Sequence, residues 1–261
     1  MMGAMRFSVL ASGSGGNSCY VEAGNARVLI DAGLSCREIE RRLGQVGVRA
    51  EGLDAIIITH EHTDHIRGAG PLARRYNLPL FINHGTLEQA RNRLGVLPES
   101  MLVPTGESLS IKGLIVETFT KCHDAADPIG LVLSSDGSRI GLVTDLGRST
   151  RLVEDRLKEC KALVMEFNYD PDMLDEGPYP LHLKRRIKGP DGHLSNQDAG
   201  ALLRAVSHLD LRFVVLAHLS ETNNHPDKAD QAAKEVLDSC GLTETRIVLS
   251  RPDAPAPMIE L

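Results

Sequence analysis

Short apolar runs recur along the chain, and glycine, asparagine or serine stands at the ends of most of them. Apolar runs of this length, bounded by turn residues, predict strands. The run at 53–60 is almost wholly apolar, as expected of a strand whose sheet is covered on both faces. The predicted strands lie at 5–12, 19–24, 26–33, 53–60, within 108–123, and at 129–135, 138–147, 162–170, 212–220 and 246–250.

Between these runs the apolar positions change to helical spacing, often behind a capping signal such as Ser35 followed by Glu38. The pattern of strands alternating with helices predicts an α/β fold with helices outside the sheets. The chain shows no repeat, linker or low-complexity segment, so we expect one domain over 1–261, made of two consecutive ββα-type halves that meet near 147–160. The predicted helices lie at 35–47, 86–95, 149–160, 195–209 and 226–241.

Composition narrows the possible functions. Tryptophan is absent and aromatic residues make up 3% of the 261 residues, so the core must be aliphatic. The formal net charge of −6 gives no general attraction to nucleic acid or to an anionic membrane. No apolar stretch approaches the roughly 18 residues of a membrane span, and residues 1–10 lack a leader pattern. The five cysteines form no CxxC pair, which favours a cytoplasmic protein with reduced thiols.

The motif HEHTDH, which follows the apolar run at 53–60, concentrates metal-ligand side chains. In an extended chain His60 and His62 point to the same side, and Asp64 continues that alternation. His65 breaks it and reaches a different point if the chain turns there. Imidazole and carboxylate together suit divalent metals, and this geometry favours two adjacent ions over one.

Further ligands must then come from elsewhere in the chain. Three side chains of the right type stand where an apolar run ends: His123, Asp145 and His218. A single histidine in such a place is more often structural, but three in the same placement favour ligands. The sequence therefore predicts that these three side chains join the HEHTDH cluster.

The HEHTDH motif, followed by His123, Asp145 and His218 in that order, resembles the metallo-β-lactamase superfamily of metal-dependent hydrolases. The resemblance implies a four-layer αββα sandwich, in which two mixed sheets face each other, helices lie outside, and the site lies at one edge between the sheets. It implies that Asp31 supports the metal loop without binding metal. It also implies two metal ions, the first held by His60, His62 and His123 and the second by Asp64, His65 and His218, with Asp145 bridging both.

Several segments, among them ASGSGGNS at 11–18, GPYPLHLKRRI at 177–187 and GHLSN at 192–196, resemble the bacterial YycJ-like (WalJ-like) branch. That branch is associated with 5′-exonuclease activity on DNA. GHLSN also resembles the tRNA 3′-processing ribonucleases of the superfamily, which place a histidine that is not a ligand near the scissile phosphate, and His193 matches it.

Two cations about 3.5–4 Å apart lower the pKa of a shared water toward neutrality and draw in a phosphate, so we expect attack by a metal-bound hydroxide. Asp64 would accept a hydrogen bond from this nucleophile, and His193 would donate a proton to the leaving oxygen. Histidine with carboxylate suits zinc, manganese or iron, and we favour zinc or manganese.

Candidate substrate contacts are less specific. The glycine-rich stretch 11–18 could bind a phosphate through its amides, although a tight hairpin explains it equally well. The basic run at 184–188 could follow a nucleic-acid backbone, although such runs are usually solvated surface. Glu166 and Asn168 could orient ligands, and Tyr169 could stack on a base or pack in the core. The candidate substrate contacts are Ser12, Ser14, Asn17, Asn168, Lys184, Arg185, Ser195 and Asn196.

Three functions from different classes remain. The first is a phosphodiesterase that acts on nucleic acid, with DNA as the expected partner, and His193 and the basic run favour it. The second is a small-molecule hydrolase that cleaves a thioester, lactone or cyclic phosphodiester, and the net charge of −6 and scarce aromatic residues favour it. The third is a metal-binding protein without catalysis, against which all seven ligand positions hold competent residues.

Overall fold

The computed structural model describes residues 4–261, which form two seven-stranded sheets. Residues 1–3, the beginning of the segment expected to lack a leader, lie outside the described residues. Sheet A contains β1 (Arg6–Ala11), β2 (Ser18–Ala23), β3 (Ala26–Ile30), β4 (Ala55–Ile57), β5 (Pro79–Ile82), β6 (Glu99–Leu102) and β14 (Ile259–Glu260). Sheet B contains β7 (Ser108–Ile111), β8 (Leu114–Thr120), β9 (Ile129–Ser135), β10 (Ser138–Val143), β11 (Ala162–Glu166), β12 (Phe213–Ala217) and β13 (Arg246–Leu249).

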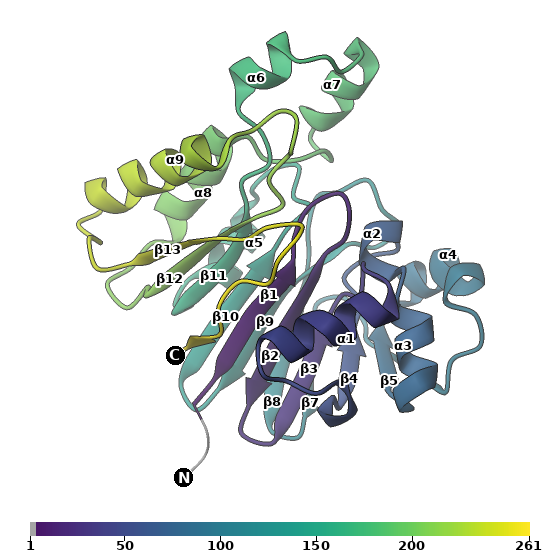
Figure 1. The fold of residues 1–261 in the computed structure, drawn as a ribbon. Coiled ribbons are helices and arrows are strands. Elements are labelled where there is room, and N and C mark those ends of the chain that lie inside the picture. Colours follow the sequence, from purple (N-terminus) through teal and green to yellow (C-terminus); the bar gives the residue numbers. More distant parts are fainter. Residues whose placement is uncertain (1–3) are drawn as a thin grey trace.

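The helices lie outside these sheets (Figure 1). They are α1 (Cys36–Gln45), α2 (Thr63–Ile66), α3 (Ala69–Tyr76), α4 (His84–Leu94), α5 (Arg151–Leu157), α6 (Pro171–Glu176), α7 (Leu181–Ile187), α8 (Asn196–Val206) and α9 (Pro226–Ser239), with a short 3-10 helix η1 (Ala50–Gly52). Among the described residues, no helix has both the length and the apolar character needed to cross a membrane.

The strand order is β14-β1-β2-β3-β4-β5-β6 in sheet A and β13-β12-β11-β10-β9-β8-β7 in sheet B. Both sheets mix parallel and antiparallel pairs, such as β3 with β4 and β1 with β2 in sheet A. The expected αββα sandwich is confirmed. The chain passes from one sheet to the other between β6 and β7, and the division into halves near 147–160 stays a prediction.

The apolar alternation of the strands divides the core into three layers. Val28 and Ile30 of β3 face the other sheet, in a cluster that includes Leu131 and Val164 of sheet B. Leu29, between them in sequence, belongs instead to the cluster under α1, α3 and α4. A third cluster lies between sheet B and helices α5, α8 and α9. Side chains that alternate between two buried faces explain the nearly continuous apolar runs in the sequence.

The topology brings the ends of several strands to one edge of the sandwich. Strands β10, β11 and β12 are mutually parallel, and β8 runs in the same direction because both β8 and β10 pair antiparallel with β9. Their carboxyl ends lead to His123, Asp145, Glu166 and His218. In sheet A, β3 and β4 are parallel and lead toward Asp31 and the HEHTDH motif. Ligands commonly bind beyond the carboxyl ends of strands in α/β sheets.

Strand β4 is shorter than the predicted strand 53–60 at both ends, because it begins at Ala55 and ends at Ile57. A side chain replaces the sheet partner two residues later, where the Thr59 N–H donates to Asp31 Oδ1 over 2.8 Å. The chain is thereby released from the sheet just before the first histidine of the motif.

Candidate metal centre

The segment after β4 is fixed by the buried carboxylate of Asp31. The Thr59 hydroxyl donates to Asp31 Oδ2 over 2.8 Å, and Nδ1 of His65 lies 2.8 Å from the same oxygen. Because a carboxylate only accepts, this contact assigns the proton to Nδ1 and leaves Nε2 of His65 to face the site. Asp31 thus has the supporting position that the resemblance implied.

The chain turns earlier in the motif than the sequence suggested. His62 is extended and caps α2, whereas Asp64 lies within this helix and does not continue the extended alternation. Backbone bonds from distant segments fix the turn: Asn17 N–H donates to Asp64 O and Ala32 N–H donates to His65 O, both over 2.7 Å. The local sequence does not predict these long-range backbone partners, so the expected extended alternation was wrong at Asp64.

The glycine-rich stretch 11–18 supports the ligand-bearing segments. Asn17 Nδ2 donates to Asp64 Oδ2 over 3.1 Å and lies 3.0 Å from His65 Nε2. The Ser12 hydroxyl accepts the N–H of His218 over 2.7 Å. Ser12 and Asn17 are buried and their polar atoms form hydrogen bonds with the protein's own loops, whereas Ser14 is exposed.

Close backbone packing at Gly33 completes this support. A Cβ at this position would lie 1.5 Å from the carbonyl oxygen of Asp64, so any larger residue would displace the turn that carries Asp64 and His65. Gly33 N–H also donates to Asn17 O over 2.9 Å, which ties the glycine-rich stretch to the same point.

The three distant candidates meet the motif. His123 Nε2 lies 3.3 Å from His62 Nδ1, and Asp145 Oδ2 lies 3.2 Å from His65 Nε2. His218 Nε2 is 3.5 Å from the other oxygen of Asp145, Oδ1. The ligand atoms form three overlapping groups, each within 4.8 Å: His60 with His62 and His123, His60 with His65 and Asp145, and Asp145 with His193 and His218.

One of these groups coincides with an implied ligand set, and the implied second set, Asp64 with His65 and His218, does not form a group. The coinciding group is the first, and Asp145 is shared by the other two. Asp64 belongs to none of the three groups, although its Oδ2 lies 3.6 Å from His65 Nε2. His193, expected to be a non-ligand, lies within one group. The assignment of individual ligands stays a prediction.

Three of the central residues adopt a left-handed backbone. The φ angles are 56° at Asp31, 55° at Asp145 and 56° at His218. Positive φ is uncommon outside glycine, although asparagine, aspartate and histidine adopt it more often than other residues, and it is concentrated at functional sites. Each of the three residues lies just after a strand, and each side chain contacts another member of the centre: Asp31 and Asp145 contact His65, and His218 contacts Asp145.

Several atoms in the centre lack a partner among the described residues. His60 Nε2 and His218 Nε2 are buried and form no hydrogen bond, and the buried Asp145 Oδ2 meets only His65 Nε2, at 3.2 Å. A buried polar atom left without a partner costs about 1–3 kcal/mol. Imidazole nitrogens and a carboxylate oxygen are ligands for divalent cations, so the residues fit such a metal.

Charge within the centre is balanced by protons on two rings. Burial lowers the pKa of His60 well below its usual value. Burial also acts to lower the pKa of His65 and His218. Asp145 and Asp31 nevertheless raise the pKa of His65 to about 10. Asp145 and Glu166 raise the pKa of His218 to about 9. Cations would therefore replace two protons that the metal-free protein holds at neutral pH.

Glu166 links two of these rings. Its Oε1 lies 2.7 Å from His193 Nδ1 and 3.2 Å from His218 Nδ1, while its Oε2 accepts the Leu146 N–H over 2.6 Å. Burial alone would raise the pKa of Glu166, but the charges of the two rings lower it, so it remains a carboxylate. As an acceptor it assigns the proton to Nδ1 of both rings and leaves each Nε2 for the site.

The remaining substrate candidates fall into two groups. Asn168 is buried and its Nδ2 donates to His218 O over 2.7 Å, so it supports the loop after β12. This contact agrees with the orienting role considered for Asn168, the alternative to a substrate contact. Ser195 caps α8, and the amide of Asn196 pairs with that of Asn224. Their polar atoms are already hydrogen-bonded within the protein. Lys184 is half-buried and Arg185 exposed, both on α7.

Two residues of the centre were missed in the sequence. Lys121 is buried and its Nζ donates to Thr144 O over 2.5 Å, and burial lowers the pKa of this lysine. Asp124 directly follows a candidate ligand, and its Oδ1 lies 3.5 Å from His123 Nε2. The adjacency of Asp124 to His123 was a usable signal, whereas nothing in the local sequence marked Lys121.

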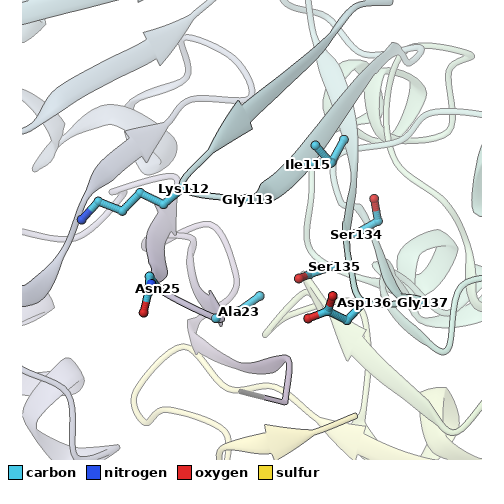
Figure 2. A pocket seen from close by; sticks show the side chains of 10 residues that line it. Ala23, Asn25, Lys112, Gly113, Ile115, Ser134, Ser135, Asp136 and Gly137 are labelled. Carbon is cyan, nitrogen blue, oxygen red and sulfur yellow. The ribbon is translucent and has the colours of Figure 1, made fainter. Parts of the chain in front are cut away.

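A separate hollow of about 550 Å³ lies among three hairpin turns and contains no metal-ligand cluster (Figure 2). Gly24, Gly113 and Gly137 line it. The side chain of Lys112 extends away from Ser134 and Ser135 in this view, and it pairs with Asp54 over 2.5 Å. We assign no function to this hollow.

Comparison with known proteins identifies the family of this chain. The family model described as "Beta-lactamase superfamily domain" matches residues 26–219. The chain is 36% identical over 239 residues to "Exodeoxyribonuclease YycJ" of Bacillus anthracis, covering 91% of this chain and 90% of the relative. It is 34% identical over 264 residues to "Exodeoxyribonuclease WalJ" of Streptococcus pneumoniae serotype 2 (strain D39 / NCTC 7466), covering 98% of each.

The solved structures support the fold. The metallo-β-lactamase fold protein YhfI from Bacillus subtilis has a TM-score of 0.78 at 17% identity, covering 99% of this chain and 100% of that one. Identity at this level shows the architecture alone, whereas the sequence relatives extend the likeness to a branch. The chain therefore belongs to the beta-lactamase superfamily, and within it to the branch of the YycJ and WalJ proteins.

Proposed function

We propose that this protein is a metal-dependent phosphodiesterase that degrades DNA from the 5′ end in the cytoplasm. The observation that carries the proposal is the convergence of histidines and carboxylates at one edge of the sandwich, with buried ligand atoms that form no hydrogen bond within residues 4–261. Relatives named exodeoxyribonucleases, 34–36% identical over most of the chain, support DNA as the substrate.

The proposed centre holds two divalent cations, zinc or manganese. His60, His62 and His123 would hold one, and Asp64, His65 and His218 the other, with Asp145 between them. The chemistry that such cations supply is Lewis acidity, which activates water at neutral pH and offsets negative charge on a phosphate.

The protein's own groups would control protons and orientation. Asp64 lies on the first turn of α2 and its side chain is 24% exposed, so one carboxylate oxygen can accept a hydrogen bond from the attacking water while Asn17 holds the other. His193 is 19% exposed and is oriented by Glu166. When protonated, it can donate from Nε2 to the leaving oxygen of the phosphodiester.

A second candidate is a small-molecule hydrolase on the same scaffold. The net charge of −6 favours it, because a polyanion would be repelled outside the immediate site. The low aromatic content of 3% also provides few platforms for stacked bases. The two candidates share the metal centre and differ in the substrate that reaches it.

The test uses metal-loaded protein and four substrates: DNA labelled at the 5′ end, DNA labelled at the 3′ end, a thioester and a cyclic phosphodiester. Release of mononucleotides from the 5′-labelled end, before shortening from the 3′ end, supports the proposal. Turnover of the thioester or cyclic phosphodiester with intact DNA would favour the second candidate. Asp64→Ala serves as the control for catalysis, and equal activity of this variant would remove the mechanism.

A further inference from the structure

Helices α6 and α7 stand outside the two sheets and apart from the helices that cover them (Figure 1). The segment 184–188 carries four basic residues in a chain whose net charge is −6. None of the seven residues of α7 is buried. A short helix is marginal without packing, so core formation does not explain why this one is present.

Two of the basic side chains are bound to the neighbouring helix. Lys184 Nζ donates to the carbonyl oxygen of Asp175 over 2.7 Å, and Lys188 Nζ pairs with Asp175 Oδ1 over 2.5 Å. These contacts join α7 to α6 and neutralise part of the charge. Arg186 differs, because its Nε donates to Asp124 Oδ2 over 2.6 Å and reaches toward the metal centre.

Asp124 lies beside two candidate metal ligands. Its Oδ1 is 3.5 Å from His123 Nε2 and 3.9 Å from His62 Nε2, and its carbonyl oxygen is 3.2 Å from the same His62 atom. The Asp124 N–H also donates to Asp191 O over 3.0 Å, which joins the loop after α7. The guanidinium of Arg186 is therefore anchored at the rim of the centre.

The anchored guanidinium keeps unused donors. The side chain of Arg186 is 59% exposed, and neither terminal nitrogen has a hydrogen-bond partner among residues 4–261. Two adjacent amino groups in one plane match the oxygens of a phosphate. Since one nitrogen is already fixed by Asp124, binding a phosphate immobilises less of the side chain.

We propose that Arg186 binds a DNA phosphate next to the phosphodiester that is cut, and so favours nucleic acid over substrates with one phosphate. This inference rests on the proposed nuclease function and adds a specificity-determining residue to it. Asp124 acts as a positioning residue for Arg186.

The test compares steady-state kinetics on a single-stranded oligonucleotide for the wild type, Arg186→Ala, Arg186→Lys and a matched control, Arg75→Ala. Arg75 is 62% exposed and its Nε pairs with Glu40 over 3.1 Å, so it resembles Arg186 in exposure and pairing but lies on α3. Metal content and thermal unfolding of each variant are measured alongside.

For Arg186→Ala we expect KM to rise about tenfold, as for loss of a charge-assisted hydrogen bond, with kcat changed less. The slope of log KM against log salt should fall by about 0.7, the value for one phosphate contact on a single strand. Arg186→Lys should keep the salt slope of the wild type, because it retains the charge. Its KM should rise less than that of Arg186→Ala but stay above the wild-type value, because lysine lacks the planar fork of the guanidinium. Arg75→Ala should match the wild type.

The outcomes separate this inference from the proposed function. If the wild type degrades DNA and the KM and salt slope of Arg186→Ala equal those of Arg75→Ala, the inference is overturned and the nuclease function stands. A fall in kcat with lost metal and an unchanged salt slope also overturns it, because Arg186 would then act through the fold. A wild type that leaves DNA intact overturns both.

Discussion

The role of Glu166 gives the sharpest test of the centre, because one isosteric change reverses its hydrogen bonding. In Glu166→Gln, the Leu146 N–H still requires an oxygen at the Oε2 position, where it now donates over 2.6 Å. The new amide nitrogen must then face His193 Nδ1 and His218 Nδ1. Both rings must accept there, so in the neutral state their protons move to Nε2, the atoms that face the site.

This reversal removes two functions at once. His218 loses the free electron pair that would hold a cation, and His193 loses its fixed orientation. Replacing an outer partner of a metal ligand typically costs 10–100-fold in affinity or activity. Because two rings are affected, we expect the upper end, about 100-fold in metal affinity, which corresponds to about 2.7 kcal/mol.

The assay is competition with a chelator of known affinity, together with kcat measured at saturating metal. Glu22→Gln is the control, since Glu22 is a largely buried carboxylate on β2, away from the centre, that pairs with Tyr20, Arg6 and Arg27. Wild-type metal affinity and kcat in Glu166→Gln, at unchanged folding, would refute the assignment of protons to Nδ1 of the two rings.

Three further predictions follow from the same geometry. Metal binding should release about two protons per protein near pH 7.5, because the raised pKa values of His65 and His218, about 10 and about 9, keep both rings charged until a cation binds. Metal affinity should therefore increase as the pH rises toward these values. An indicator-dye titration that detects no released proton would contradict this prediction. Gly33→Ala should lower the free energy of unfolding by about 2 kcal/mol or more in a denaturant titration, because the new Cβ would clash with Asp64 O. Gly44→Ala is the control and should not lower it, because a Cβ there meets nothing within 4 Å. His193→Ala should lower kcat about 10²–10⁴-fold in a steady-state assay on DNA, and a kcat equal to that of the wild type would exclude His193 as the proton donor.

Much of the fold was predictable because its strands and covering helices bury apolar faces. The capped segment 35–47 became α1, and the run at 162–170 became β11. The pattern missed α7, since a helix without buried residues has no apolar periodicity. It also missed β6, whose four residues are all exposed.

The candidate ligands were predictable for a topological reason. His123, Asp145 and His218 each follow a strand of sheet B, and these strands run in the same direction, so their ends meet. Supporting contacts were less accessible to sequence reasoning. The bond from Asn17 to Asp64 joins residues 47 positions apart, and neither residue's neighbours predict it.

The left-handed backbone at Asp31, Asp145 and His218 has a consequence for laboratory evolution. Glycine and asparagine tolerate this conformation best, while β-branched residues are excluded from it. A library randomised at His218 and screened only for thermostability should accumulate glycine and asparagine, whereas Asp31 should be kept in any screen because its carboxylate accepts from Thr59 and His65. A screen for catalysis should retain His218 as well, so the two selections would favour different residues at this position.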